Sequence, residues 1–256
     1  MEVSTETNDA GIGVSATQGY LHSIETGAAV DGPGVRCAIF LSGCDMRCLY
    51  CHNPDTWKLK HGKPITLDAL MKKITPYASF LKRAGGVTLS GGEPLMQKDF
   101  AIAILRACKE KGLHTALDTQ GYFGARLSDE ELDAIDLVML DVKLFEPVKY
   151  KHLTGVELAP TITFAERLAK LNKPVWLRYV LVPGYTDDAQ DIENLAQWAG
   201  ALGNIERVDV LPFHQLGQHK WVELGLNYTL GSVEPPTDAQ VQQARQIFLS
   251  HGLKTV

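Results

Sequence analysis

The chain has 256 residues, of which 45% are apolar and 21% are charged, a composition typical of a globular protein with a substantial buried core. Its formal net charge of -5 argues against a nucleic-acid-binding protein, because such proteins neutralise phosphates with a basic face. No run of roughly 18 apolar residues and no signal-peptide pattern occurs, which predicts a cytoplasmic protein without a membrane segment. In that reducing compartment, the five cysteines are expected to be ligands or catalysts rather than disulfides.

The first 18 residues differ in composition from the rest of the chain. They are rich in Ser, Thr, Gly and Asn and carry few large apolar side chains, so burial cannot offset the entropy of ordering them. We therefore expect residues 1–18 to form a flexible N-terminal tail. Residues 19–256 are expected to form one domain, since no linker or internal repeat interrupts them.

From residue 20 onward, short β-branched runs alternate with longer segments of helical periodicity. The predicted strands are 35–41, 86–89, 114–117, 137–140, 175–180 and 207–211. The predicted helices lie near 66–82, 98–111, 128–134, 161–171, 188–200 and 237–251. Strict alternation predicts an α/β fold with parallel strands and right-handed crossovers. The sheet is then either open and doubly wound or a barrel, and because six units cannot close an eight-stranded barrel, we expect an open, partial TIM-type (β/α)6 barrel.

Each predicted strand is followed at or near its carboxyl end by polar or reactive residues, and in parallel α/β folds these ends share one face. In chain order they are Cys44, Cys48 and Cys51, then Ser90 to Pro94, Asp118 with Thr119, Asp141 with Lys143, Arg178, and His214. Taken singly, each has a structural explanation, such as a tight glycine turn, a loop cap or a solvated lysine. Their coincidence on one face predicts an active site there.

Three cysteines in the spacing C-x3-C-x2-C form an incomplete ligand set. With His52 they could complete a tetrahedral zinc site, although the adjacent Cys51 and His52 would reach one metal with difficulty. The alternative is an iron-sulfur cluster, whose cubane form normally takes four thiolates. Three thiolates leave one iron open, where a small molecule can bind and react. Cys37, in a strand, and Cys108, on the apolar side of a helix, are predicted to be core residues.

The cysteine spacing, with aromatic Tyr50 before the last cysteine, resembles the signature of the radical S-adenosylmethionine (SAM) enzymes. The surrounding segment DGPGVRCAIFLSGCDMRCLYCHN, residues 31–53, is similar to the narrower signature of the glycyl radical enzyme activases. Later segments, including GGVTLSGGEPL, LDTQGY, LVMLDVK, VWLRYVLVPGYTDD and LPFHQLGQHKW, resemble the branch of that family whose partner is pyruvate formate-lyase. The likeness extends from about residue 20 to the C-terminus.

The resemblance implies two cofactors, one 4Fe-4S cluster held by the three cysteines and SAM on its open iron. Gly92 would receive the amino group of SAM, while the backbone at Tyr50, Cys51 and His52 would lie against its adenine. The other expected cofactor contacts are Asp141, Val142, Lys143, Leu144, Phe145 and His214. The residues expected to act in catalysis are Cys44, Cys48, Cys51, Lys143 and His214.

Two further sites follow from the same resemblance. Asp118 and Asp141 match positions that hold a monovalent cation in this family, and Asp31 and Arg178 match positions near the target peptide. No second cysteine cluster is present, so the ferredoxin-like insertion of many other activases is expected to be absent.

The implied reaction begins with an electron from a low-potential donor such as flavodoxin or ferredoxin. It cleaves SAM reductively to a 5'-deoxyadenosyl radical, which abstracts hydrogen from a glycine of the partner glycyl radical enzyme. We expect the chain to act as a monomer. The alternatives are an activase of another glycyl radical enzyme, a radical SAM enzyme that acts on a small molecule, and a non-catalytic metal or electron-carrier protein. Residues 31–36 and 214–221 favour an activase over the small-molecule enzyme. The missing fourth cysteine ligand and the six polar strand ends argue against the carrier protein.

Overall fold

Successive parallel strands pair in the order in which they follow one another along the chain. The computed structural model describes residues 16–256, which contain an eight-stranded sheet in the order β3-β1-β2-β4-β5-β6-β7-β8. The strands are β1 Gln18–Ala28, β2 Val35–Leu41, β3 Lys63–Thr66, β4 Gly85–Gly91, β5 Thr115–Thr119, β6 Leu137–Asp141, β7 Val175–Leu181 and β8 Ile205–Pro212. From β2 to β8 every pairing is parallel.

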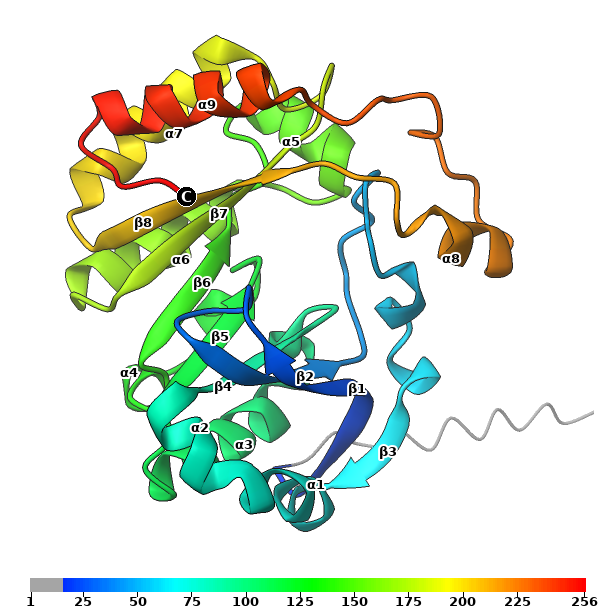
Figure 1. The fold of residues 1–256 in the computed structure, drawn as a ribbon, viewed down its shortest axis with the longest axis vertical. Helices are drawn as coiled ribbons and strands as arrows, with labels where there is room; N and C mark the ends of the chain where they lie inside the picture. The colour runs from blue at the N-terminus through cyan, green and yellow to red at the C-terminus, as the bar shows by residue number, and fades with distance from the viewer. Residues whose placement is uncertain (1–15) are drawn as a thin grey trace, which may run out of the picture.

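This strand order decides between the two architectures left open by the sequence. A doubly wound sheet reverses its strand order at a switch point, whereas β2 to β8 never reverse. Same-handed crossovers then carry the helices over one face and the sheet curls as in a barrel. Figure 1 shows this curvature from β1 and β2 round to β7 and β8, with the helices on the outer side. Since β3 and β8 end the strand order without pairing to each other, the predicted open, partial barrel is confirmed.

The helices follow the predicted segments with two additions. They are α1 Leu67–Ile74, α2 Ala78–Ala84, α3 Lys98–Glu110, α4 Asp129–Leu132, α5 Pro147–Thr154, α6 Ala159–Lys170, α7 Ala189–Leu202, α8 Gln218–Glu223 and α9 Asp238–Ser250. The helix predicted near 66–82 is two helices joined by a 3-10 turn at Thr75–Tyr77, because Pro76 has no N–H to continue the first. The short helices α5 and α8 were not predicted.

The antiparallel edge of the sheet was also not predicted. β1 pairs antiparallel to both β2 and β3, and β3 is only four residues long and mostly exposed. Such a short polar edge strand carries little periodic signal. β1 begins at Gln18, one residue before the predicted domain boundary, while residues 1–15 of the predicted tail lie outside the described residues.

The core lies between the curved sheet and its outer helices. Phe100, Ile104 and Cys108 of α3 are fully buried, as is Cys37 of β2, so both cysteines are core residues as predicted. None of the helices in residues 16–256 combines the length and the apolar character needed to cross a membrane.

Candidate active site

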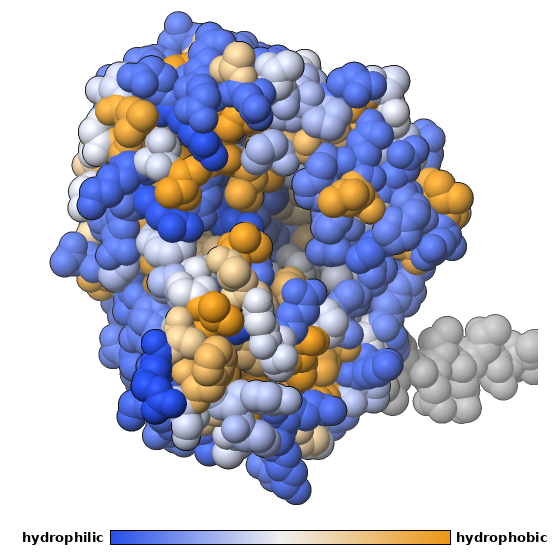
Figure 2. Space-filling view, viewed as in Figure 1, coloured by the Kyte–Doolittle hydropathy of each residue, from blue (hydrophilic) through white to orange (hydrophobic). Residues whose placement is uncertain are grey.

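A cavity of about 470 Å³ opens at the carboxyl ends of the parallel strands. Figure 2 shows the hollow near the middle of this face. All six parallel strands, or the loops that follow them, contribute to its lining. The predicted site residues that line it are Asp31, Cys44, Cys48, Tyr50, Cys51, His52, Gly92, Asp118, Asp141, Lys143, Arg178 and His214.

Three predicted residues do not line this cavity. Val142 and Leu144 are buried in the core. Phe145 packs against Trp198, with ring centroids 5.4 Å apart, and lines a separate cavity beside α5, α6 and α7. In the segment after β6, therefore, the alternate residues Asp141 and Lys143 face the site.

The loop after β2 presents the three thiols. Backbone hydrogen bonds hold it at both ends, from Gly43 N to Thr56 O (2.6 Å), from Cys44 N to Trp57 O (3.0 Å) and from Arg47 N to Thr154 O (2.7 Å). All three cysteines are free thiols. Burial raises the pKa of Cys48 to about 12, with Lys143 acting in the opposite direction. A metal bound here would displace the thiol protons.

The donor set fits an iron-sulfur cluster better than a single zinc ion. The three sulfurs line one cavity, whose wall has no further cysteine. No group of three His, Cys, Asp or Glu side chains in residues 16–256 is placed to hold one metal ion. A cubane takes its thiolates on different irons, so its ligands surround a volume rather than one point.

A partly buried ion pair lies beside the cysteines. Lys143 Nζ is 2.9 Å from Asp141 Oδ2 and 5.8 Å from the ring centroid of Tyr50. Although burial alone would lower the pKa of Lys143, the Asp141 carboxylate and its other neighbours hold it well above its ordinary value. The ammonium is therefore charged and suited to pair with a carboxylate of a bound molecule.

A second cluster of charges lies on the strands that flank β6, where Arg178 of β7 is the direct cross-strand neighbour of Asp141. Asp118 Oδ2 accepts hydrogen bonds from Ser90 Oγ (2.7 Å) and Arg178 NH1 (3.0 Å). Asp118 Oδ1 and Arg178 Nε are buried without a hydrogen-bond partner in the structure. Burial and the nearby Asp118 raise the pKa of Asp31, which lines the same cavity. A free buried carboxylate oxygen next to a second acid is suited to a cation or a polar ligand.

The Gly92 turn lies directly against the cysteine-bearing loop. Glu93 N donates to Gly43 O at 2.7 Å, and a Cβ atom added to Gly92 would overlap that same carbonyl. Only glycine permits this approach. The close contact between the Gly92 turn and the cysteine-bearing loop therefore depends on the missing side chain at position 92.

Glu93 organises this turn, a role that the sequence reasoning missed. Its fully buried carboxylate accepts hydrogen bonds from Leu95 N (2.8 Å), Thr119 Oγ1 (2.9 Å) and Gln120 N (3.0 Å). It thus joins the loop after β4 to the loop after β5. A glutamate between two glycines and a proline was the available signal, but its partners in the second loop, Thr119 and Gln120, lie 26 and 27 residues later.

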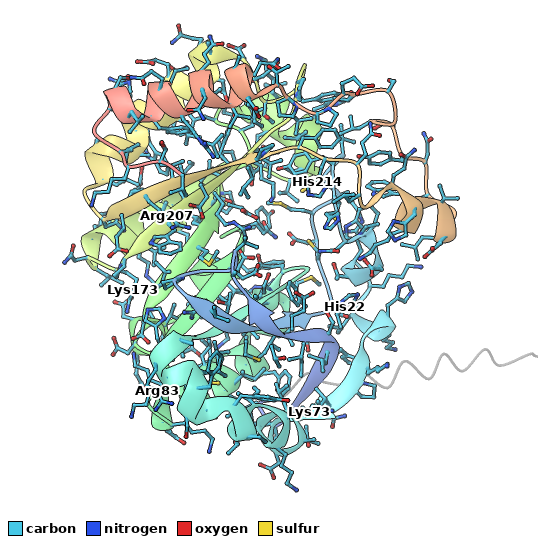
Figure 3. The ribbon with its side chains drawn as sticks, in the orientation of Figure 1. His22, Lys73, Arg83, Lys173, Arg207 and His214 are labelled. Atoms are coloured by element: carbon cyan, nitrogen blue, oxygen red, sulfur yellow. The ribbon has the colours of Figure 1, made fainter. Side chains whose placement is uncertain are left out.

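The helix α8 closes one side of the site. Trp221 Nε1 donates to Cys51 O at 2.9 Å, and Lys220 Nζ donates to Asn53 Oδ1 at 2.8 Å. His52 and His214 meet edge to face, with ring centroids 4.8 Å apart. Figure 3 shows His214, after β8, and His22, from β1, near the same opening. Burial, followed by the charge of His214, lowers the pKa of His52, which favours its neutral ring.

Comparisons with known proteins agree with this geometry. A family profile described as a 4Fe-4S single cluster domain matches residues 30–156. A pyruvate formate-lyase 1-activating enzyme of Escherichia coli (strain K12) is 43% identical over 241 residues, covering 93% of this chain and 98% of the relative.

Two solved structures are similar in fold. A domain of a pyruvate-formate lyase-activating enzyme from Bacteroides vulgatus ATCC 8482 aligns with a TM-score of 0.56 and 26% identity, covering 68% of this chain and 98% of that one. A radical SAM methyltransferase from Sphaerobacter thermophilus aligns with a TM-score of 0.62 over 86% of this chain and 65% of that one, and at 16% identity it shows the fold alone. The identity across nearly the whole chain, together with the cysteine-lined cavity, shows that this chain belongs to the family of pyruvate formate-lyase-activating enzymes.

Proposed function

We propose that the cavity at the strand ends is where this chain generates the radical that activates pyruvate formate-lyase. The observation that carries the proposal is the set of three free thiols, which lines the same cavity as the Gly92 turn and the polar strand ends. When bound, a reduced 4Fe-4S cluster would supply the electron for reductive cleavage of SAM, which would provide the 5'-deoxyadenosyl group that abstracts hydrogen from a glycine of the partner.

In this proposal Cys44, Cys48 and Cys51 hold the cluster. The Lys143 ammonium, kept charged by Asp141, pairs with the carboxylate of SAM. The backbone of Gly92 meets its amino group, since no side chain separates that turn from the cysteine-bearing loop. Contacts of Val142, Leu144 and Phe145 with SAM remain a prediction. The side chains of these three residues do not line the cavity.

On the adenine side, the backbone at Tyr50, Cys51 and His52 and the ring of His214 provide contacts. The edge-to-face pair of His52 and His214 forms one wall of the pocket. A neutral His52 accepts a flat aromatic base without the cost of desolvating a charge.

A monovalent cation is proposed between Asp118 and Asp141. The unpartnered Asp118 Oδ1 supports it, because a buried carboxylate oxygen without a donor is an available ligand. Asp31 and Arg178 are proposed to meet the glycine-bearing peptide at the mouth of the cavity. Both side chains line it, and Arg178 is oriented by its hydrogen bond to Asp118.

The partner is a glycyl radical enzyme. We further propose that the chain works as a monomer in the cytoplasm and receives its electron from flavodoxin or a ferredoxin. Five free thiols suit a reducing compartment.

Anaerobic reconstitution tests the proposal. The protein loaded with iron and sulfide is reduced with dithionite and mixed with SAM and pyruvate formate-lyase. We expect 5'-deoxyadenosine to form and a carbon-radical resonance to appear on the partner. Formation of 5'-deoxyadenosine without a radical on the partner would instead indicate a different substrate.

A further inference from the structure

Basic side chains gather in the chain segment that leaves the cysteine-bearing loop. Residues 47–63 contain four Lys or Arg and a single acid, in a chain whose net charge is -5. Within residues 47–63 the exposed cations without a carboxylate partner in the described residues are Arg47, Lys58, Lys60 and Lys63. The last three, with exposed His61, we call the 58–63 basic segment. The one acid, Asp55, is already paired with His22 and Lys220.

This segment lies against the loop that carries the cluster ligands. Trp57 O accepts the hydrogen bond from Cys44 N, and Lys58 follows directly in the chain. The exposed Arg47 adds a fifth basic side chain, because its guanidinium donates to Cys44 O at 2.7 Å and lies 4.8 Å from the ring centroid of Trp57. In Figure 1 this part of the chain runs down the side of the molecule between α8 and β3.

The residues of the basic segment do not themselves line the cavity. None of the residues 58–63 does so, whereas Asp31 and Arg178, proposed to meet the peptide, both do, as does Trp57 directly before the segment. The basic segment therefore borders the cavity without forming its lining. Two indoles contact the cysteine-bearing loop beside this surface. Trp57 O accepts from Cys44 N, Trp57 packs edge to face on Trp221, and Trp221 Nε1 donates to Cys51 O.

We propose that the 58–63 basic segment, with Arg47, is the docking surface for the acidic redox protein that reduces the cluster. The inference rests on the proposed function, which requires an external electron. A positive patch on an acidic protein attracts a partner of opposite surface charge and orients it during encounter. Here the patch adjoins the loop that carries the proposed cluster ligands, since Lys58 follows Trp57, whose carbonyl accepts from Cys44 N, and Arg47 lies in that loop.

The test compares two reductants and two charge reversals. Lys58→Glu/Lys60→Glu alters the basic segment, and Lys72→Glu/Lys73→Glu makes the same charge change at exposed positions of α1, where Figure 3 shows Lys73 at the far end of the molecule from His214. The reconstituted proteins are reduced either with dithionite or with reduced flavodoxin, an acidic protein used as the probe. Bleaching of the cluster absorption and formation of 5'-deoxyadenosine are measured at low and high salt.

We expect Lys58→Glu/Lys60→Glu to slow reduction by flavodoxin at least about 10-fold at low salt, with the difference shrinking as salt screens the charges. Dithionite should reduce the cluster of this variant at the wild-type rate. Flavodoxin should reduce the control variant Lys72→Glu/Lys73→Glu at the wild-type rate.

Three other outcomes overturn the proposal. If flavodoxin reduces the cluster of Lys58→Glu/Lys60→Glu at the wild-type rate, and this variant still cleaves SAM with dithionite, the basic segment is not the docking surface. The proposed function would still stand. If dithionite supports 5'-deoxyadenosine formation but the variant transfers less radical to pyruvate formate-lyase, the segment binds the substrate protein instead. If the wild-type protein cleaves no SAM with either reductant, the proposed function is wrong, and the proposed docking surface is wrong with it.

Discussion

Cysteines of identical chemistry have different roles here because their surroundings differ. Cys48 lies on the loop after β2 and lines the cavity, whereas Cys108 lies on the buried side of α3, away from it. Burial raises the pKa of both thiols to about 12. Position, rather than acidity, therefore separates the proposed ligand from the core residue.

This contrast predicts opposite outcomes for the same substitution. Cys48→Ala should abolish cleavage of SAM and leave the reconstituted protein without a full complement of iron and sulfide, because one thiolate is missing. Cys108→Ala should retain the cluster and the activity and lower the free energy of unfolding by about 1 kcal/mol, as the loss of a small buried side chain does. Iron analysis and urea unfolding measure both effects. Loss of the cluster in Cys108→Ala would contradict its assignment to the core.

A buried carboxyl gives the fold a pH dependence. Burial raises the pKa of Glu93 to about 7, against the opposing hydrogen bonds from Leu95, Gln120 and Thr119. The unfolded chain releases this proton near pH 4.5, while the folded protein holds it up to about pH 7. The contribution of Glu93 to the free energy of unfolding is therefore highest below pH 4.5 and is lost as the pH rises to 7.

Glu93→Gln removes this titration. Relative to the variant, the cluster-free wild-type protein should lose up to about 3 kcal/mol of unfolding free energy between pH 4.5 and 7, and no more above it. Urea unfolding of both proteins across this range measures the difference, in which other titrating groups cancel. A difference that stays constant with pH would show that Glu93 is ionised in the folded state.

At the scale of elements, β2 carries the cysteine-bearing loop and is fixed to its neighbour by a buried arginine. The Arg36 side chain donates to Thr88 Oγ1 and Val87 O of β4, both at 2.6 Å, and Thr88 in turn donates to Asp31 O. Burial lowers the pKa of Arg36 to about 10, which still leaves it charged at neutral pH. The segment that bears Asp31 is thereby tied to the same two strands as the cluster loop and the Gly92 turn.

Among the contacts that hold α8 to the cysteine-bearing loop, the hydrogen bond from Trp221 can be removed by a conservative change. Trp221→Phe keeps an aromatic ring against Trp57 and Tyr228 but loses the donor to Cys51 O. We expect a loss of about 1 kcal/mol in unfolding free energy and faster removal of iron by a chelator. Trp198→Phe is the matched control, because the buried Trp198 Nε1 has no acceptor to lose. Equal chelation rates in the two variants would exclude this role for α8.

At the scale of the whole molecule, the fold and the proposed cluster are separable. The sheet and its outer helices pack through aliphatic and aromatic side chains, and the three thiols lie beyond the end of β2. The proposed 4Fe-4S cluster is thus expected to bind to a scaffold that is already folded, rather than to be the main source of its stability.

Removal of the cluster should therefore leave the secondary structure intact. After treatment with a chelator and an oxidant, we expect an unchanged far-UV circular dichroism spectrum, a lower melting temperature and sedimentation as a monomer of 28.1 kDa. The protein with its cluster is the control for each measurement. A spectrum of an unfolded chain would mean that the cluster is required for folding.

The sequence by itself determined the features that depend on near neighbours in the chain. β2 was predicted at its observed bounds, 35–41, and all six parallel strands were recognised, because each is a short apolar run bounded by turn residues. The cysteine motif lies within one loop, so its spacing, together with its resemblance to the radical SAM signature, was enough to predict an iron-sulfur cluster.

Only the tertiary structure decided what depends on contacts between distant segments. Trp221 lies 170 residues from Cys51, and the partners of Glu93 and Arg36 lie on other strands or loops. The edge strands β1 and β3 and the helix α8 form because they find partners in the folded chain, so local periodicity gives little sign of them. The tertiary structure also decided the curl of the sheet. The order of the strands, rather than any one strand, brings the carboxyl ends of six strands around one cavity.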